Sequence, residues 1–248
     1  MNLHNQLAVV TGAASGIGRA TAAAFTAAGA RVVVADIDQA KGEEAAAALR
    51  AAGHMAEYLA VDMTDRASIE GFAARVLERC GTPDVIVNGA GWGKNAPFWE
   101  GEQAFWDKIV NLNFIGPMQL VKALLPRMIE RGSGRIINIA SDAGRVGSLG
   151  ETVYSAAKGG VIAFTKSLAR EAARFGVNVN CVCPGPTDTP LYNRVPEKIR
   201  EAFTRAIPFR RVAQPQEIAD AILFFASSRS DYVTGQILSV SGGLTLAG

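Results

Sequence analysis

Short apolar runs alternate along the chain with longer, Ala-rich segments of mixed polarity. The runs are LAVVT (7–11), RVVVA (31–35), AEYLA (56–60), DVIVN (84–88), RIINIA (135–140), VNVNCVC (177–183) and ILSV (237–240). Their length and their β-branched residues predict strands, and the segments between them are long enough for helices. Seven strands alternating with helices predict a parallel sheet with right-handed crossovers.

The runs at 32–34 and 136–139 are almost continuously apolar, which is typical of strands covered by helices on both faces. The predicted fold class is therefore α/β, a single-domain, Rossmann-like doubly wound parallel sheet of seven strands with helices on both faces. No repeat or linker divides the chain, so we expect one domain over residues 1–248.

Residues 186–212 break this rhythm, because four prolines surround a short helical stretch, at positions 186, 190, 196 and 208. We interpret the segment as a substrate lid. Within it, residues 194–211 carry six Lys or Arg and two Glu, a local charge of +4. Such a patch could attract the phosphates of coenzyme A, although a charge run is usually the solvated face of a helix.

The overall composition argues against several classes of partner. The net charge is +2 without a long block of Lys or Arg, so nucleic acid is not an expected partner. No stretch approaches the roughly 20 apolar residues that span a bilayer, and MNLHNQLAVVTG lacks the features of a secretory signal, so we expect a cytoplasmic protein without a membrane partner. The two His and three Cys fit no metal-binding spacing, so no metal is expected.

Gly12, Gly16 and Gly18 follow the first predicted strand and open the first helix. Because glycine lacks Cβ, a diphosphate can approach the N–H groups at the helix start, where the helix dipole favours an anion. The spacing is G-x-x-x-G-x-G, and a strand-to-helix turn can also use glycine for packing alone. We interpret the loop as a dinucleotide cradle.

Asp36 ends the second predicted strand, downstream of that loop. A carboxylate there accepts hydrogen bonds from the adenosine ribose hydroxyls and repels a 2′-phosphate. Ser15 and Ile37 are not basic, so neither offers a cation to that phosphate. These residues favour NAD(H) over NADP(H). The alternative is that Asp36 only caps the following helix.

YSAAK places Tyr154 and Lys158 on one face at the start of a predicted helix. A tyrosine with its usual pKa of about 10 is a poor base at neutral pH, and a neighbouring ammonium favours its phenolate. Ser141, after the strand RIINIA, could orient a carbonyl oxygen while Tyr154 exchanges its proton. A Tyr-x-x-x-Lys pair is common alone, but together with the Gly-rich loop and Asp36 it indicates a catalytic site.

These pieces resemble the classical short-chain dehydrogenase/reductase family along essentially the whole chain. The matching pieces, in order, are TGAASGIG, Asp36, Asp62, NGAG (88–91), Asn111 in VNL, Ser141, YSAAK, PGPTDT (184–189) and GQILSVSGG. Their joint order is far more specific than any one piece. One departure is visible: the family usually has NNAG, and Gly89 replaces the second Asn, which puts a structural hydrogen bond in doubt.

The resemblance implies a role for each matching residue. It makes Tyr154 the proton donor or acceptor and Ser141 the holder of the substrate oxygen. Lys158 would bind the nicotinamide ribose and lower the pKa of Tyr154, and Asn111 would support a proton-relay water. The implied cofactor-binding residues are Gly12, Ser15, Gly16, Ile17, Gly18, Asp36, Ile37, Asp62, Met63, Asn88, Ala90, Gly91, Tyr154, Lys158, Pro184, Gly185, Thr187 and Thr189. A homotetramer is also implied.

The substrate is expected to contact segments outside these motifs. Trp92 and Phe98 stand near the expected pocket mouth, and Arg145 and Ser148 lie between the expected catalytic serine and tyrosine. The Arg145 guanidinium could bind a carboxylate, a thioester oxygen or a phosphate, or pair with a neighbouring carboxylate. Within the family, NIASDAGRVGSLGETVYSAAKGG resembles members that oxidise a cyclic β-hydroxyacyl-CoA with NAD. We expect a small-molecule substrate of that kind, a CoA thioester.

Other functions stay open. A 3-oxoacyl-(acyl carrier protein) reductase shares the catalytic motifs but normally uses NADPH, against which Asp36 argues, and Phe175 stands where its docking Arg would fall. A simple cyclic or aromatic alcohol dehydrogenase without a thioester fits the motifs equally well. A non-catalytic dinucleotide-binding protein is disfavoured, because the whole set of catalytic residue types is present.

Overall fold

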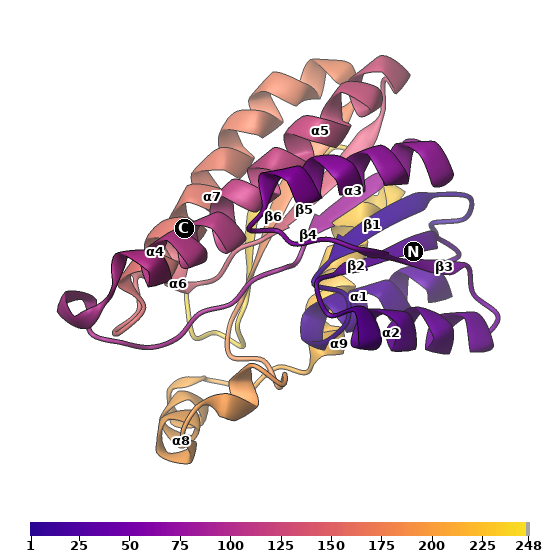
Figure 1. Cartoon of the computed structure of the whole chain (residues 1–248). Helices are drawn as coiled ribbons and strands as arrows, with labels where there is room; N and C mark the ends of the chain where they lie inside the picture. Colours follow the sequence, from indigo (N-terminus) through magenta and orange to yellow (C-terminus); the bar gives the residue numbers. More distant parts are fainter. Residues whose placement is uncertain (247–248) are drawn as a thin grey trace.

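The computed structural model describes residues 1–246 and contains a parallel sheet between two layers of helices (Figure 1). The strands are β1 (Leu7–Thr11), β2 (Arg31–Asp36), β3 (Ala56–Ala60), β4 (Val85–Asn88), β5 (Gly134–Ile139), β6 (Val177–Pro184) and β7 (Ile237–Val240). Their spatial order is β3-β2-β1-β4-β5-β6-β7. The predicted fold class is confirmed, and every predicted strand is present with small differences at the ends.

The helices that connect the strands cover both faces of the sheet. They are α1 (Gly16–Ala27), α2 (Gln39–Ala51), α3 (Arg66–Arg79), α4 (Gln103–Val110), α5 (Gly116–Arg131), α6 (Ala143–Val146), α7 (Thr152–Ala172), α8 (Glu197–Ala206) and α9 (Pro215–Ala226). α1, α2 and α9 lie on one face, and α3, α5 and α7 on the other (Figure 1). Within residues 1–246, no helix is long and apolar enough to cross a membrane.

Short turns of helix complete the connections. A π-helical turn, η2 (Asn111–Ile115), joins α4 to α5. The 3₁₀ turns are η1 (Phe98–Glu100), η3 (Ala173–Phe175), η4 (Tyr192–Arg194) and η5 (Ser228–Ser230). π-Helical turns often occur at functional sites, and η2 lies next to the candidate site described below.

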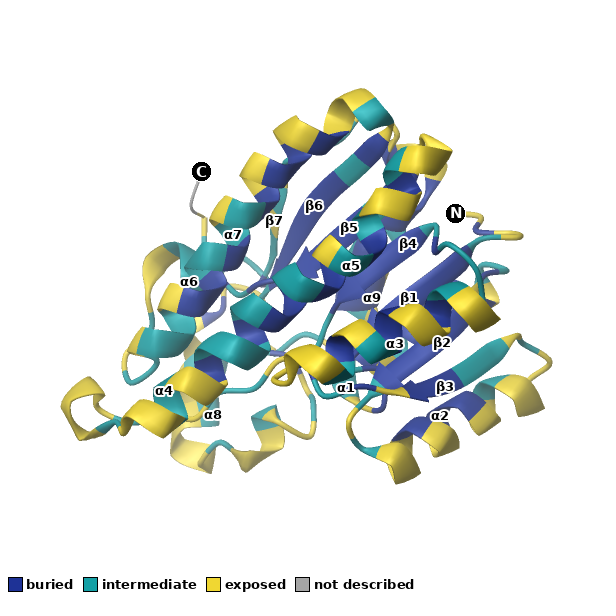
Figure 2. Cartoon of the chain, turned by 45° about the horizontal axis from the view of Figure 1, so that its top comes forward, coloured by how far each residue is buried: buried dark blue, intermediate teal, exposed yellow. Residues whose placement is uncertain are grey.

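An apolar core fills each face of the sheet, and the strands are buried throughout most of their length (Figure 2). Neighbouring residues of β1 point to opposite faces, so Val9 belongs to one core and Val10 to the other. Phe72 of α3 packs into the same core as Val9, and Phe25 of α1 packs into the same core as Val10. Each fully buried side chain of this size contributes about 1.5–3 kcal/mol. Burial on both faces explains the continuous apolar runs.

The order of the strands reverses between β1 and β4, which lie side by side. The loops after these two strands therefore diverge and leave a crevice at the carboxyl edge of the sheet. They also approach each other closely, because a Cβ on Gly12 would lie 2.8 Å from Cα of Ala90. A ligand at this edge would contact the loops from both halves of the sheet.

Gly89 follows β4 at a point where its backbone lies close to the end of β1. A Cβ at this position would lie 2.7 Å from the carbonyl oxygen of Thr11, closer than real Cβ atoms come. The Thr11 hydroxyl instead accepts hydrogen bonds from the N–H groups of Gly89 (3.1 Å) and Ala90 (3.2 Å). The link between β1 and the β4 loop is thus made by a threonine hydroxyl and two backbone groups, without a side chain at position 89.

The segment expected to form a lid projects from the carboxyl edge of the sheet (Figure 1). It contains η4 and α8, and none of the α8 residues is buried. Figure 2 shows the same helix with exposed and half-buried residues only. Its base is held where the backbone N–H of Ala213 donates to the carbonyl oxygen of Pro186 at 3.0 Å. A helix with so few buried contacts can move without disturbing the core.

Candidate active site

The Gly-rich loop after β1 can accept only glycine at its critical positions. Gly12 and Gly16 have φ of +69° and +53°, in the left-handed region. A Cβ on Gly18 would lie 2.2 Å from the carbonyl oxygen of Gly12. The side chain of Ser15 does not cap α1. It therefore does not occupy the N–H groups of the first helical turn, which are the groups that would bind an anion. The loop has the geometry of a diphosphate cradle.

The Asp36 carboxylate lies against this loop. Its Oδ2 accepts from the backbone N–H of Ala14, and its Oδ1 accepts from that of Asp38, both at 3.0 Å. The N-cap of α2 is Asp38, whose side chain accepts from the N–H of Lys41. Asp36 therefore is not the N-cap of α2, which removes the alternative that this residue only caps the helix.

The other expected cofactor residues also lie at the carboxyl ends of the strands. Asp62 and Met63 follow β3, and Oδ1 of Asp62 accepts from the N–H and hydroxyl of Thr64. A Cβ on Gly16 would lie 3.2 Å from the side chain of Thr189, so the chain after β6 reaches the Gly-rich loop. Ile17 lies in the first turn of α1. The remaining expected residues stand at or just after the ends of their strands, and these are Ile37, Asn88, Ala90, Gly91, Pro184, Gly185 and Thr187.

Tyr154, Lys158 and Ser141 meet where α7 begins beside the end of β5. The Ser141 hydroxyl is hydrogen-bonded to Tyr154. Nζ of Lys158 lies 5.6 Å from the centre of the Tyr154 ring and donates to the carbonyl oxygen of Ile139 at 2.8 Å. Helical spacing of four residues places both side chains on one face of α7, as predicted.

Burial dominates the proton affinities of this pair. It raises the pKa of Tyr154, and the charge of Glu151 raises it further, while the Ser141 hydrogen bond lowers it. Burial lowers the pKa of Lys158 to about 8. Lys158 was expected to lower the pKa of Tyr154. The net shift in this structure is upward, because desolvation of the phenolate outweighs the favourable contacts.

Cys181 and Cys183 of β6 lie behind this group. Both are fully buried in a small apolar cluster with Ala140 and Val161, as the strand spacing predicts. Their electrostatic interaction with Lys158 raises its pKa, and so offsets part of the lowering that burial causes. The thiols thus form the inner wall of the site.

Asn113, which the sequence analysis did not single out, is the asparagine of η2 that reaches the site. It is fully buried, and its amide donates to the carbonyl oxygens of Trp92 (2.8 Å) and Ile109 (2.9 Å). Its Oδ1 is buried without a protein partner. A Cβ on Gly91 would lie 2.9 Å from this oxygen and 3.3 Å from Nζ of Lys158, so both atoms border one small space.

Asn111, the asparagine named in the sequence analysis, begins η2. It is half-buried at the start of η2, and its carbonyl oxygen accepts from the N–H of Gly116. The water-supporting role of Asn111 stays a prediction, and Asn113, whose free oxygen borders the Lys158 space, joins it as a candidate for that role. The two asparagines stand two residues apart, and a one-sequence motif match could not show that both lie in the same helical turn.

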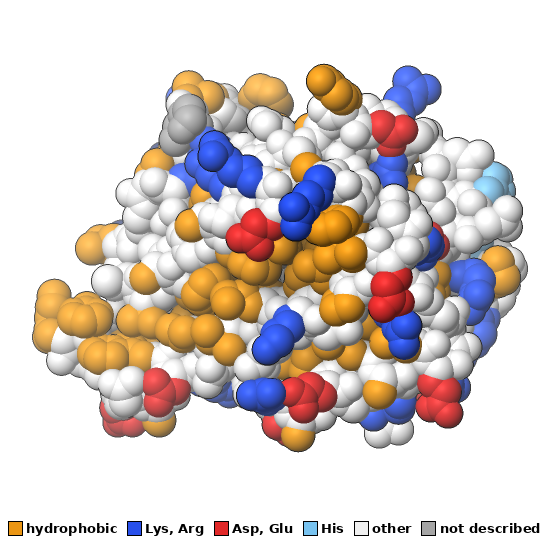
Figure 3. All heavy atoms as spheres, turned by 90° about the horizontal axis from the view of Figure 1, so that it is seen from above, with side chains coloured by type: hydrophobic (Ala, Val, Ile, Leu, Met, Phe, Trp, Pro, Cys, Tyr) orange, Lys and Arg blue, Asp and Glu red, His pale blue; other side chains and the backbone are white. Residues whose placement is uncertain are grey.

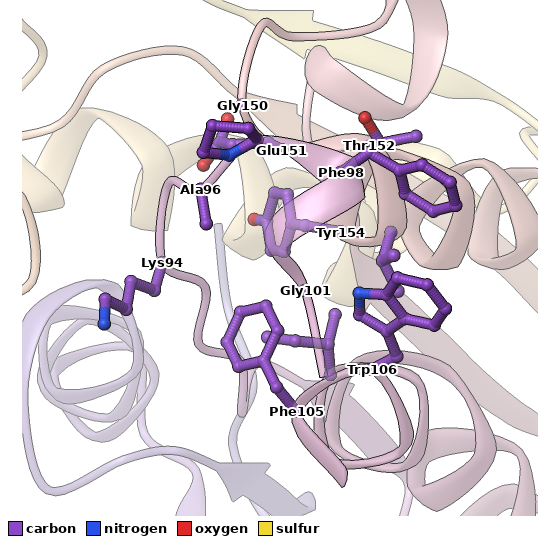
Figure 4. A pocket seen from close by; sticks show the side chains of 13 residues that line it. Lys94, Ala96, Phe98, Gly101, Phe105, Trp106, Gly150, Glu151, Thr152 and Tyr154 are labelled. Carbon is purple, nitrogen blue, oxygen red and sulfur yellow. The ribbon is translucent and has the colours of Figure 1, made fainter. Parts of the chain in front are cut away.

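A pocket beside Tyr154 is lined mainly by apolar and aromatic side chains (Figure 4). Phe98 and Trp106 stack with ring centres 4.9 Å apart. Phe105 and Trp106 come from α4 and stand near the Tyr154 ring, whereas Lys94 extends away from it (Figure 4). The pocket offers an apolar, aromatic surface that the Tyr154 side chain also lines.

Of the four expected substrate residues, Phe98 lines this pocket, whereas Trp92, Arg145 and Ser148 do not. Trp92 contacts Phe105 edge-on, with 6.0 Å between the ring centres. The Ser148 carbonyl accepts from the N–H of Glu151, and the charge of Arg145 acts on the thiol of Cys183. Substrate contacts of Trp92, Arg145 and Ser148 stay predictions, and Phe105 and Trp106 join Phe98 as candidates.

Comparison with known proteins agrees with this arrangement. Residues 12–245 match the family described as enoyl-(acyl carrier protein) reductase. The chain is 37% identical over 246 residues to 3-oxoacyl-(acyl-carrier-protein) reductase FabG of Thermotoga maritima, with 99% of this chain and 100% of that protein covered. This chain belongs to the classical short-chain dehydrogenase/reductase family. Its members are oxidoreductases that use a nicotinamide cofactor.

Two further relatives of this short-chain dehydrogenase/reductase carry a ring in the named substrate. The chain is 37% identical over 246 residues to (2S)-((R)-hydroxy(phenyl)methyl)succinyl-CoA dehydrogenase subunit BbsD of Thauera aromatica, covering 99% of each. It is 41% identical over 241 residues to cis-4-hydroxycyclohexanecarboxylate dehydrogenase of Sinomonas cyclohexanicum, covering 97% and 96%. A candidate gluconate dehydrogenase from Agrobacterium tumefaciens superposes with a TM-score of 0.95 at 32% identity, covering 99% of this chain and 98% of that one.

The residues present fit the family's nicotinamide dinucleotide. The Gly-rich loop provides the cradle, and the buried Oδ1 of Asn113 beside Gly91 is a polar atom that has no protein partner. Among residues 1–246, no group of three or more His, Cys, Asp or Glu is placed to hold a metal ion.

Proposed function

We propose that the protein oxidises the secondary alcohol of a cyclic β-hydroxyacyl-CoA, such as 2-hydroxycyclohexanecarboxyl-CoA, to the β-keto thioester with NAD. The observation that carries this proposal is the aromatic wall of Phe98, Phe105 and Trp106 beside Tyr154. A flat apolar wall suits a ring, and apolar pockets with few polar groups are typical small-molecule sites. The ring-bearing substrates named for two relatives support the same class.

The residues have distinct roles in this reaction. Oxidation removes a proton from the alcohol oxygen and a hydride from the carbon that bears it. A nicotinamide dinucleotide, when bound, supplies the hydride acceptor. Tyr154 accepts the proton in its phenolate form; burial disfavours that form and raises the pKa of Tyr154, while the hydrogen bond with Ser141 partly offsets this effect. Ser141 also orients the substrate oxygen as the carbonyl forms.

The proton then leaves through the space that Lys158 and Asn113 share. Nζ of Lys158 and Oδ1 of Asn113 border one position beside Gly91, where a water molecule would have both a donor and an acceptor. Such a water carries the proton away from Tyr154. Asn113, held by Trp92 and Ile109, acts as a positioning residue for this water.

NAD is the proposed form of the cofactor. Both oxygens of the Asp36 carboxylate are fixed by backbone N–H groups at the edge of the cradle. A fixed negative charge at the end of β2 repels a 2′-phosphate and accepts from ribose hydroxyls. The similarity to 3-oxoacyl-(acyl-carrier-protein) reductase supports the second candidate, reduction of a 3-oxoacyl thioester.

A homotetramer in the cytoplasm remains part of the proposal. Figure 3 looks onto the face of α5 and α7 and shows hydrophobic side chains gathered across it. A groove on this face is lined by Leu125, Ile129, Leu168 and Phe175 among others. An apolar groove on two long helices supports subunit contact there.

The experiment compares initial rates of NAD reduction with 2-hydroxycyclohexanecarboxyl-CoA, the matching free acid and a plain cyclic alcohol. Tyr154→Phe serves as the blank. We expect a large advantage for the thioester. Equal or better rates with the free acid or the alcohol would remove coenzyme A from the proposal. Efficient NADPH-dependent reduction of a 3-oxoacyl carrier thioester, without alcohol oxidation by NAD, would favour the second candidate.

A further inference from the structure

Asp142 is a buried carboxylate that directly follows Ser141. Only 5% of the residue is exposed. Both of its oxygens lie within reach of the Ser239 hydroxyl, at 2.7 and 2.6 Å. Ser239 belongs to β7, 97 residues further along the chain. Hydrogen bonds to a charged acceptor are stronger than those between neutral groups, so this contact ties the Ser141 turn firmly to the edge strand.

The turn that carries Ser141 is also held from two other sides. The backbone N–H of Ala143 donates to the Ser141 hydroxyl at 3.2 Å, which leaves the hydroxyl proton for Tyr154 or a substrate oxygen. A Cβ on Gly144 would lie 2.6 Å from the carbonyl carbon of Lys158, so α6 rests directly on α7. Asp142 closes this arrangement on the side of β7.

The same contact continues toward the nicotinamide end of the site. The Ser239 and Ser241 hydroxyls are 3.1 Å apart. A Cβ on Gly185 would lie 2.8 Å from Cβ of Ser241, and the Gly185 N–H donates to the Val240 carbonyl at 3.0 Å. The loop after β6, which contains Gly185, is therefore packed against the residues that hold Asp142.

We propose that Asp142 is a positioning residue that fixes the Ser141 hydroxyl relative to Tyr154 and, through Ser239 and Ser241, to the loop at the nicotinamide end. The proposal rests on the proposed function, because it assigns Ser141 to the substrate oxygen. Its chemistry is a hydrogen-bonded anchor: Asp142 itself touches neither substrate nor cofactor. Orientation of reacting groups has large effects on rate, and a displacement of about 1 Å can cost roughly 100-fold.

The test uses Asp142→Ala and Ser239→Ala, which each remove one partner, and Ser239→Thr, which keeps the hydroxyl. We expect kcat for alcohol oxidation to fall roughly 10- to 100-fold in both alanine variants. The KM for NAD should change less than kcat, because the Gly-rich loop and Asp36 are untouched and only the loop at the nicotinamide end is loosened. Ser239→Thr should stay close to the unaltered protein. The double alanine variant should be no slower than the worse single one, since both remove the same contact.

Asp65→Ala is the matched control for loss of stability alone. Asp65 is exposed and caps α3 through the N–H of Ala67, outside the Ser141 turn, β7 and the loop after β6. Its loss should lower the unfolding temperature without changing kcat per folded molecule. Unchanged kcat in Ser239→Ala would overturn the proposal. So would a drop in kcat that only follows the unfolded fraction. If Asp142→Ala does not fold, Ser239→Ala decides alone.

Hydrogen exchange measured by mass spectrometry provides a readout that needs no substrate. Loss of the anchor should speed amide exchange in residues 141–147 and in the loop at 185–187, and Asp65→Ala should not. If the unaltered protein oxidises no alcohol, the proposed function fails. Faster local exchange in Ser239→Ala would still support the anchor, whereas unchanged exchange there would contradict it.

Discussion

Lys158 donates from Nζ to the carbonyl oxygen of Ile139 at 2.8 Å, in a site where the lysine is only 4% exposed. This bond fixes the ammonium beneath Tyr154, but one hydrogen bond does not replace the water that the ammonium has lost. Burial therefore lowers the pKa of Lys158 from 10.5 to about 8. The site holds a charged group at a cost to the free energy of folding.

Replacement of Lys158 by Met should show this cost. In the unfolded chain the lysine stays protonated up to its ordinary pKa of 10.5, whereas in the folded protein it releases its proton near pH 8. The unfolded state thus binds more protons between these values, so the stability of the unaltered protein rises with pH there. A shift of this size corresponds to about 3 kcal/mol.

The expected result is that the stability advantage of Lys158→Met over the unaltered protein shrinks by up to about 3 kcal/mol between pH 7 and pH 10.5. Urea unfolding of both proteins across this range measures the difference directly. The Ile139 carbonyl loses its partner in the variant at every pH, so that effect shifts the whole curve and not its slope. A pH-independent difference would contradict the lowered pKa. The variant should also lose activity.

Asn113 and Asn111 form a matched pair of substitutions. Asn113→Ala removes both buried hydrogen bonds and the oxygen that borders the Lys158 space. We expect it to lower kcat by roughly 10-fold or more and the stability by about 1–3 kcal/mol. Asn111→Ala should have a much smaller effect, because Asn111 contributes its carbonyl oxygen to η2 and that oxygen remains.

Steady-state rates and urea unfolding of the two asparagine variants test this assignment. A larger loss of kcat in Asn111→Ala than in Asn113→Ala would assign the proton-relay role to Asn111 and not to Asn113. Equal, small losses would mean that neither asparagine supports proton transfer.

Gly89 should not tolerate even an alanine in this structure, although the family resemblance predicts an asparagine at this position. Its Cβ would lie 2.7 Å from the Thr11 carbonyl oxygen, so the two strand loops would have to separate. We expect Gly89→Ala to destabilise the protein by about 1–3 kcal/mol. Gly71→Ala is the control: its Cβ meets only the end of the Arg75 side chain at 3.7 Å, within α3.

The control glycine should respond in the opposite direction. Alanine favours a helix interior over glycine by about 1 kcal/mol, so Gly71→Ala should raise the unfolding temperature. A neutral or stabilising Gly89→Ala would show that the loops after β1 and β4 can separate at little cost.

The sequence predicted the sheet well because the signal is local. β1 and β5 are buried on both faces, and that burial leaves an apolar run visible in the chain itself. The pairing of Tyr154 with Lys158 was also predictable from the sequence, since helical spacing alone puts the two side chains on one face. Contacts between distant segments were not predictable: Phe105 and Trp106 reach the pocket, and Asp142 meets Ser239, only after the chain has folded.

The cofactor preference depends on Asp36, and Asp36→Asn tests it with little change in shape. The amide can still accept from one backbone N–H, but the charge that repels a 2′-phosphate is gone. We expect the ratio of kcat/KM for NAD to that for NADP to fall by roughly 10-fold or more. Asp38→Asn is the control, because Asp38 caps α2 and pairs with Lys41, one turn from the cradle. An unchanged ratio in Asp36→Asn, or an equal change in Asp38→Asn, would mean that general surface charge and not this carboxylate sets the preference.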